Sequence, residues 1–208
     1  MFNRSIRTTR GNADFQLINI AVKNIDFALI SIEHLLNDEN INVELYGDSN
    51  TYYFFHLQSI MAACGNIYNV FFNRGIYGNT RGYNQSAYNR SVRLRNAYNI
   101  SKREFRLVFE REVRNTNAHF DDRYEEFDGV IGDYNVIDHQ TSREEIYIIE
   151  NQSHLRTFDN RTKTYITYKR ENGAFSKVQI DLNELQTQLQ AMRERIINNP
   201  QYNSGWEE

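Results

Sequence analysis

The chain of 208 residues has a single cysteine, Cys64, and a single proline, Pro200. One cysteine cannot form an internal disulfide, so the fold must rest on its hydrophobic core. Cys64 lies in an apolar run with Met61, Ala62 and Ala63, and we interpret it as a small core residue. The sequence also lacks a CxxC pair, a glycine-rich phosphate loop and a nucleophile elbow. It therefore carries none of these signatures of metal, nucleotide or serine-hydrolase chemistry.

Long uninterrupted apolar runs are absent too. The apolar stretch 15–30 is broken by Lys23, Asn24 and Asp26, so it does not predict a membrane span. The first fifteen residues contain no apolar block of the kind found in signal peptides. Together with the lone cysteine, these features favour a cytoplasmic protein with no membrane partner.

The composition is that of a globular protein. Hydrophobic residues make up 40% of the chain and charged residues 25%, and the net charge is −3. No internal repeat or long flexible linker divides the sequence, and its length is enough for one substantial core. We therefore predict a single domain over 1–208.

The first predicted helix has an unusually apolar pattern. From Phe15 to Leu36, apolar residues recur at gaps of three and four, as on one face of an α-helix. Further apolar residues widen this face: Leu17, Ile20, Phe27 and Ile30. A helix with so much apolar circumference is expected to be covered on more than one side.

Three more helices are predicted before residue 130. The apolar spacing over 54–71 predicts the second helix, and a weaker pattern predicts the third over 85–98. Candidate N-caps of the second helix are Asp48, Ser49 and Asn50. Ser101 and Glu104 form a capping box, which predicts a fourth helix over 101–127.

The pattern changes after residue 130. Short β-branched and aromatic segments between about 145 and 180, separated by "DNRT" and "ENGA", predict a small antiparallel β-meander. Asp181 and Glu184 form a second capping box, which predicts a last helix over about 181–198. The predicted fold is therefore mainly α. A helical bundle over about 11–130 is followed by a β-meander, inserted before the C-terminal helix.

Residues 74–103 form a basic segment. They contain seven Arg or Lys residues and no Asp or Glu, and several tyrosines are interleaved with them. Basic side chains bind phosphates and aromatic rings stack on unpaired bases, so this segment is a candidate RNA-binding surface. The arginines that we assign to it are Arg81, Arg90, Arg93 and Arg95. The alternative is a solvated surface that balances the acidic stretch 121–150.

Within the predicted fourth helix, "RNTNAH" brings Arg114, Asn115 and His119 into six positions. Histidine exchanges protons near neutral pH, arginine donates to phosphate oxygens, and an asparagine amide can position either group. Such groups can cleave RNA without a metal or other cofactor. A base removes the 2′-hydroxyl proton, a cation stabilises the charge on the phosphate, and an acid protonates the leaving 5′-oxygen. The alternative is a solvated helix surface that contains a histidine.

The spacing of the motif favours a dimer. Arg114 and His119 would lie about 140° apart around an ideal helix and roughly 7.5 Å apart along it. One intact helix would not close both side chains on one phosphate. Two copies packed antiparallel across a two-fold axis would pool two arginines and two histidines in one cleft.

The motif resembles that of the HEPN superfamily, in which an Arg and a His are separated by four to six residues, often with Asn directly after the Arg. The resemblance implies a small helical bundle and a metal-independent endoribonuclease that works as a homodimer. Arg114 and His119 would be the catalytic pair, and Asn115 the supporting polar residue. It also implies RNA as the substrate. Since many members act in toxin–antitoxin, phage-defence or RNA-processing systems, a neutralising protein partner is a further expectation.

Four candidate cation ligands lie close together in the sequence: Asp128, Asp133, Asp138 and His139. Their spacing matches no calcium-binding loop, so we interpret them as an acidic surface loop and predict no metal site. His34 and His56 are interpreted as capping or packing residues.

Two alternatives to a ribonuclease remain open. The first is a non-catalytic HEPN-like module that binds RNA, a nucleotide or a protein. The second is an interaction protein whose apolar helix faces bind another chain. RNA binding separates the second alternative from the others, and strand cleavage separates the enzyme from the non-catalytic module.

Overall fold

The structure is a computed structural model that describes residues 10–37, 45, 47–73, 85–110, 136–141, 154–171 and 174–204. Its helices are α1 (Arg10–Leu36), α3 (Ser49–Phe72), α4 (Gln85–Tyr98), α7 (Leu182–Ile197) and α8 (Pro200–Ser204). Its strands are β1 (Val136–Thr141), β2 (His154–Asp159), β3 (Thr164–Glu171) and β4 (Ala174–Asp181). The described part of the chain is thus mainly helical with a small sheet, as the sequence predicts.

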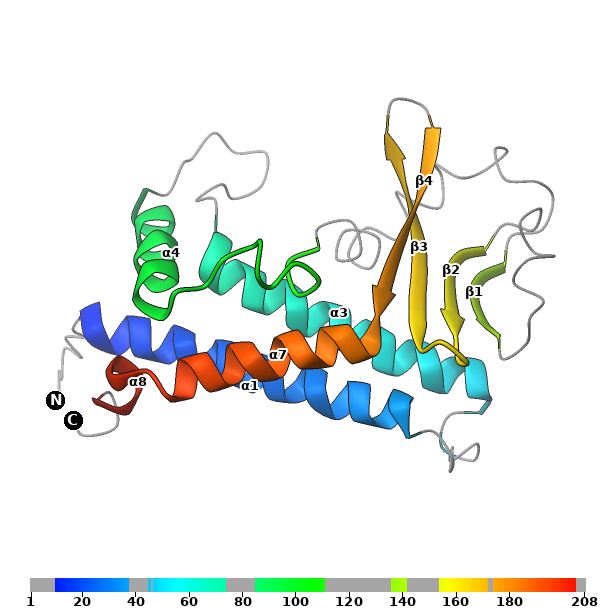
Figure 1. Ribbon diagram of the computed structural model, residues 1–208, viewed down its shortest axis with the longest axis horizontal. Coiled ribbons are helices and arrows are strands. Elements are labelled where there is room, and N and C mark those ends of the chain that lie inside the picture. The colour runs from blue at the N-terminus through cyan, green and yellow to red at the C-terminus, as the bar shows by residue number, and fades with distance from the viewer. Residues whose placement is uncertain are drawn as a thin grey trace, which may run out of the picture.

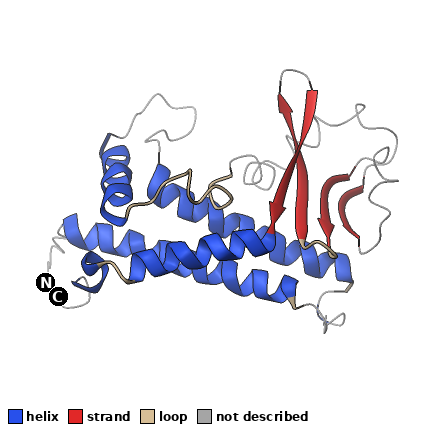
Figure 2. Cartoon of the chain, in the orientation of Figure 1, coloured by secondary structure: helices blue, strands red, loops and turns tan. Residues whose placement is uncertain are grey.

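Three long helices form the body of the molecule. α1 and α3 lie antiparallel, and α7 packs along α1 in the same direction as α3 (Figure 1). α4 covers the end where α1 begins and α3 ends, and the sheet stands at the opposite end (Figure 2). The polypeptide therefore has a helical end and a sheet end, joined by the three long helices.

α1 is the central element of the core. Ile18, Ile25 and Ile32 lie on its predicted apolar face and are fully buried. Both α3 and α7 pack against α1, which confirms that this helix is covered on more than one side. Ala13–Leu36 would be long and apolar enough to cross a membrane by length and composition alone. The buried isoleucines show that many of its apolar residues pack in the core of the protein.

Two helix starts follow their predicted caps. The Thr51 backbone N–H donates to Asp48 Oδ1 at 2.6 Å at the start of α3, and this hydrogen bond is the main cause of the lowered pKa of Asp48. Asp181 Oδ1 accepts from the backbone N–H groups of Asn183 and Glu184 at the start of α7. Each carboxylate thus satisfies N–H groups that have no partner within the helix.

Asp181→Ala is expected to lower the free energy of unfolding by about 1 kcal/mol, because two N–H groups at the start of α7 lose their acceptor. Urea denaturation at neutral pH measures this change. Gln190→Ala, an exposed position in the middle of α7, is the matched control and should leave the unfolding midpoint nearly unchanged. Equal midpoints for the two variants would contradict the capping role.

The predicted fourth helix is wrong where it was expected to begin. Residues 102–109 form consecutive turns rather than a helix. The Glu104 N–H donates to Ser101 Oγ at 3.3 Å as predicted, but the Glu104 carboxylate binds Arg195 of α7. The Leu107 N–H donates to Gln188 Oε1 of α7 at 2.9 Å. Backbone bonds of helical spacing remain from the Phe105 N–H to Ser101 and from the Phe109 N–H to Phe105, but the Leu107 N–H is taken up by α7 and no continuous helix forms. Residues 111–127 of this prediction lie outside the described residues.

The antiparallel meander is confirmed in β2, β3 and β4, which form consecutive antiparallel pairs. The sheet is not antiparallel throughout, because β1 adds to its edge in parallel with β2. Since β1 contains Asp138 and His139, part of the expected acidic loop is a strand. A parallel neighbour needs a long connection rather than a tight turn, and that pairing has no local sequence signal. The predicted strand segment at 145–150 lies outside the described residues.

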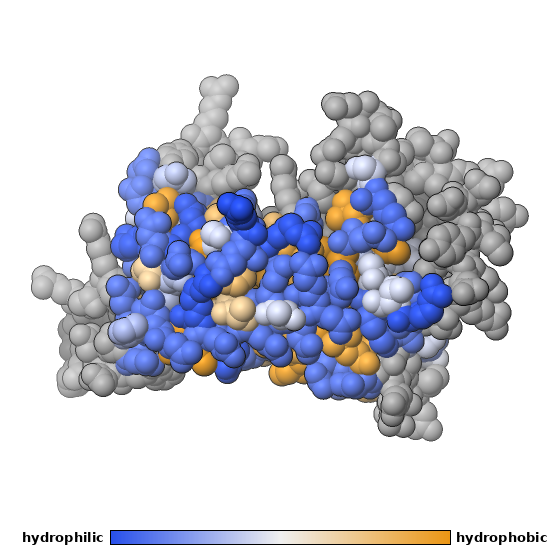
Figure 3. Space-filling view, in the orientation of Figure 1, coloured by the Kyte–Doolittle hydropathy of each residue, from blue (hydrophilic) through white to orange (hydrophobic). Residues whose placement is uncertain are grey.

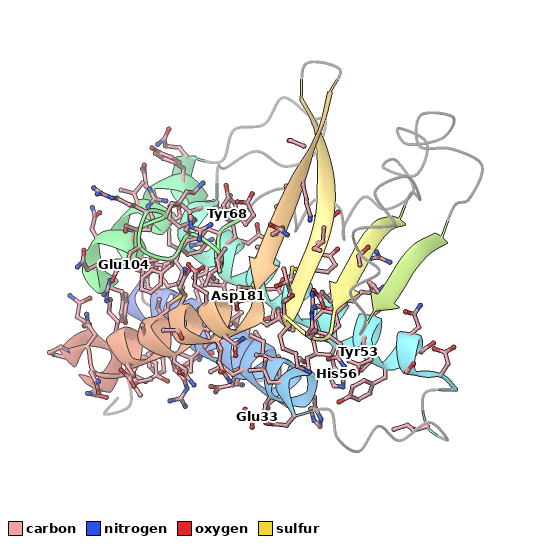
Figure 4. All side chains as sticks on the ribbon, turned by 45° about the vertical axis from the view of Figure 1, so that its right-hand side comes forward. Glu33, Tyr53, His56, Tyr68, Glu104 and Asp181 are labelled. Atoms are coloured by element: carbon pink, nitrogen blue, oxygen red, sulfur yellow. The ribbon has the colours of Figure 1, made fainter. Side chains whose placement is uncertain are left out.

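The turn between β2 and β3 joins the sheet to the helices. Asn160 Nδ2 donates to the Tyr53 hydroxyl of α3 at 3.0 Å, and Phe158 packs on the Tyr53 ring. The backbone oxygen of Lys163 accepts from the Leu182 N–H at the start of α7. Tyr53 lies close to His56 at this end of the bundle (Figure 4). The sheet is thus fixed to two of the three long helices.

Candidate functional site

The predicted catalytic residues Arg114, Asn115 and His119 lie outside the described residues, as does Arg81. The structure describes the chain on both sides of the motif. Residues 101–110 lie against the bundle before it, and β1 begins at Val136 after it. Along the chain, the motif thus lies between residue 110 on the bundle and β1 at the edge of the sheet.

Residues 101–110 are held firmly on the bundle. Four side chains of this segment are buried: Phe105, Leu107, Val108 and Phe109. The Phe109 ring lies 4.6 Å from the Phe72 ring of α3, between centroids, and α7 supplies Gln188 for the Leu107 N–H. The chain is therefore anchored up to Phe109, five residues before Arg114.

Two ion pairs add to this anchor. Glu104 accepts two hydrogen bonds from the Arg195 guanidinium, and these bonds are the main cause of the lowered pKa of Glu104. Arg106 pairs with Glu184 at 3.0 Å. All four side chains are partly exposed to solvent, so each pair contributes little stability by itself. Their geometry instead determines where residues 101–110 contact α7.

Two of the predicted RNA-binding arginines have partners within the protein. The Arg93 guanidinium donates to both carboxylate oxygens of Asp14, at 2.8 and 2.9 Å. Arg95 donates to the backbone oxygen of Phe71 at 2.5 Å, and its guanidinium carbon lies 4.6 Å from the centre of the Phe72 ring. Both arginines therefore hold α4 against the bundle. Asp14 also supplies a counter-charge that residues 74–103 themselves lack.

Arg90 differs from these two arginines. It lies half-buried on α4 and makes no hydrogen bond or ion pair with another described residue. A hollow of about 680 Å³ on α4 is lined in part by Arg93 and by Tyr88, whose side chain is 40% exposed. An exposed aromatic ring beside an arginine is suited to stack a base and to bind a phosphate. α4 is thus the best-described candidate contact for RNA.

A second hollow of about 440 Å³ lies between α1 and α3, and sequence reasoning missed it. Its apolar lining comes from Phe27 and Ile30 of α1 and from Phe55 of α3. At one end the rings of His34 and His56 stack with their centroids 4.7 Å apart. Burial first, and then the nearby His34, lower the pKa of His56 to about 4. The buried position of His56 agrees with its interpretation as a packing residue.

No three His, Cys, Asp or Glu side chains within the described ranges gather in a way that could hold a metal ion. Comparisons with protein-family models, curated proteins and solved structures gave no match to this chain. No family is assigned. The resemblance to the HEPN superfamily therefore rests on the motif residues Arg114, Asn115 and His119.

Proposed function

We propose that this protein is a metal-independent endoribonuclease of HEPN type. The observation that carries the proposal is the motif of Arg114, Asn115 and His119, which combines a proton-transfer group with a phosphate-binding cation. The anchored residues 101–110 support it, because they lead into the motif from a fixed point on the bundle. A reactive pair needs such support to keep its geometry.

The reaction proceeds by attack within the RNA itself. His119 of one copy takes the proton from the ribose 2′-hydroxyl, and the 2′-oxygen forms a bond to phosphorus. Arg114 stabilises the negative charge on the phosphate oxygens, and Asn115 positions one of these side chains. The bond from phosphorus to the 5′-oxygen breaks, and the 5′-oxygen takes a proton from the second copy's histidine. The products are a 2′,3′-cyclic phosphate and a free 5′-hydroxyl.

Incubation of purified protein with a defined RNA in the presence of EDTA tests the proposal. Defined fragments with 5′-hydroxyl and cyclic-phosphate ends are expected, because the reaction needs no metal. The same RNA with a 2′-O-methyl group at the cleaved position is the matched control, and it should stay intact because the attacking hydroxyl is blocked. Intact RNA in both reactions, or equal cleavage of the two RNAs, would contradict this mechanism.

The alternative is a non-catalytic HEPN-like module that binds RNA without cleaving it. The exposed Tyr88 beside Arg93 on α4 favours RNA binding whether or not cleavage occurs. RNA that is bound but recovered whole, with both ends unchanged, would support this alternative.

Arg90→Glu is expected to weaken RNA binding and to flatten its dependence on salt, with the slope of log affinity against log salt falling by about one. Arg90 is the suitable position because changes at Arg93 or Arg95 would also break contacts within the fold. Fluorescence anisotropy with a labelled single-stranded RNA, at several salt concentrations, measures both quantities.

Lys177→Glu is the matched control for Arg90→Glu. It makes the same change of charge at an exposed position on β4, at the other end of the molecule. A smaller loss of affinity is expected from it. Equal losses of affinity in the two variants would show that RNA binding depends on the total charge of the protein and not on α4.

A further inference from the structure

α1 has a second regular seam on the side that faces away from the core. Its exposed positions are Gln16, Ile20, Lys23, Phe27, Ile30 and His34, at alternating gaps of four and three. This is the spacing with which one helix packs along another. Phe27 and Ile30 at its centre are 58% and 57% exposed. The seam therefore has the pattern of a packed surface but is uncovered in the single chain.

α3 continues this surface with a face that carries no charge. The helix has no Asp, Glu, Lys or Arg among its 24 residues. Its exposed positions are Ser49, Thr51, Phe55, Gln58, Ala62, Asn66 and Asn69. The solvent-facing side of a surface helix normally carries charged residues, whereas the centre of a protein interface is depleted of them. The outer face of α3 has the composition of an interface.

The two helices present one continuous face. The hollow of about 440 Å³ lies between them, and its lining contains no Asp, Glu, Lys or Arg. Asn66 Nδ2 donates to Asn24 Oδ1 at 2.9 Å, which ties the two helices together within this lining. Apolar side chains are visible along the second half of α1 (Figure 3). We define the exposed residues of α1 and α3 around this hollow as the α1/α3 face.

We infer that the α1/α3 face is the interface between two copies of this chain, with each α1 antiparallel to the α1 of the second copy. The four helices would then form an antiparallel bundle around Phe27, Ile30 and Phe55 of both copies. The inference does not depend on ribonuclease activity.

Two opposite charges on the outer side of α1 favour a second copy as the occupant. Lys23 and Glu33 are exposed on α1, and each lies five residues from position 28, or roughly 7.5 Å along the axis. A two-fold axis near position 28 brings Lys23 of one copy beside Glu33 of the other, and symmetry repeats this contact. The Lys23 side chain has no hydrogen-bond or ion-pair partner among the described residues. The Glu33 carboxylate accepts from the Asn37 and Gln186 amides, but among the described residues it has no cationic partner. A strongly acidic or basic partner would find no such match, because the centre of the face is neutral.

The size of the face agrees with this occupant. α1 and α3 contain 27 and 24 residues. A surface two helices wide over the full length of α3, about 36 Å, sets an upper value of roughly 700 Å² for this area. A standard protein interface buries about 800 Å² on each partner, so the α1/α3 face is close to the area that a stable dimer needs.

Light scattering coupled to size-exclusion chromatography tests the inference on the full chain. A dimer is expected at concentrations up to about 100 µM, where even a dimer with a micromolar dissociation constant forms. Phe27→Asp should raise the dimer dissociation constant by about 100-fold or more, because it places a charge at the apolar centre. Tyr88→Asp, on an exposed aromatic residue of α4, is the matched control and should leave the mass unchanged. Circular dichroism confirms that each variant is folded.

A charge exchange tests the antiparallel arrangement without touching an apolar residue. Lys23→Glu and Glu33→Lys should each weaken the dimer about 10-fold, because like charges would then face each other. The double variant Lys23→Glu/Glu33→Lys should recover most of the affinity. Single variants without effect, or a double variant weaker than both, would overturn this pairing.

Two other outcomes would also overturn the inference. The first is a wild-type chain that stays monomeric at the highest concentration. If that monomer also floats with phosphatidylcholine vesicles, the face would be assigned to a membrane instead. The second is a dimer that Phe27→Asp and Lys23→Glu leave intact. RNA cleavage is read in a separate assay, so a dimer without cleavage would refute only the proposed function. Cleavage by a stable monomer would refute the dimer and the shared site.

Discussion

His119→Ala is expected to lower the rate of RNA cleavage by about 10²–10⁴-fold, the usual contribution of a positioned group that transfers protons. The variant can neither take the proton from the 2′-hydroxyl nor protonate the leaving oxygen. Its fold should be unchanged, because the substitution removes a polar side chain and no apolar one. Initial cleavage rates with EDTA present, beside thermal unfolding curves, measure both properties.

His154→Ala is the control for this experiment. It removes another histidine, at the first residue of β2, and should cleave at the wild-type rate. Arg114→Lys adds a second test, since it keeps the positive charge but loses the forked donors that match a phosphate. Its rate should also fall clearly. Wild-type rates for both His119→Ala and Arg114→Lys would show that the motif is not the catalytic site.

The protein is expected to lose up to about 3 kcal/mol of stability between pH 7 and pH 4 through His56. The pKa of this side chain is lowered from 6.5 to about 4 in the folded protein. Below pH 6.5, the unfolded chain binds a proton at His56 that the folded chain does not accept until about pH 4. The contribution is thus fully present above the unfolded pKa and is lost as the pH falls through this window.

The geometry around His56 explains the direction of this effect. The ring is buried, it stacks on His34, and its other ring neighbours are Tyr52 and Phe55. A proton on His56 would therefore be poorly solvated and would be repelled when His34 is charged. Asp48 and Glu104 have lowered pKa values, so their protonation on acidification also reduces the stability of the protein. A variant must therefore isolate the loss of stability that is due to His56.

His56→Phe provides this isolation, because it keeps an aromatic ring of similar size and removes the titrating group. Urea unfolding at pH 7 and at pH 4.5 should show a clearly smaller loss of stability for the variant than for the wild type. Asp48 and Glu104 are present in both proteins, so their contributions cancel in the comparison. The same loss in both proteins would show that His56 does not set the acid sensitivity.

The long helices could be predicted because their information is local. The spacing of Ile18, Ile25 and Ile32 determines one face of α1, and Asp181 marks the start of α7 by contacts only two and three residues away. Residues 101–110 looked equally helical, but their partners Gln188 and Arg195 lie more than eighty residues further along the chain. The parallel addition of β1 is likewise a pairing between distant segments.

The same difference between local signals and contacts between distant residues applies to the candidate RNA-binding and dimer residues. Arg90, Arg93 and Arg95 could be selected from their clustering, but the pairing of Arg93 with Asp14 joins positions 79 residues apart. The seam of Phe27 and Ile30 was visible in the sequence as excess apolar residues on one helix. Its neutral continuation on α3 became visible only when the antiparallel packing placed the two helices side by side.

The dependence of residues 101–110 on α7 has a consequence for synthesis. A ribosome makes the chain from its N-terminus, so Arg114 and His119 emerge before Glu184, Gln188 and Arg195 exist. Until α7 has emerged, the Leu107 N–H and the Glu104 carboxylate lack their α7 partners. A nascent chain beside messenger and ribosomal RNA would thus carry the motif before α7 can complete its anchor. Because α7 follows the motif in the chain, the contacts that it makes with residues 101–110 form only after α7 has been translated.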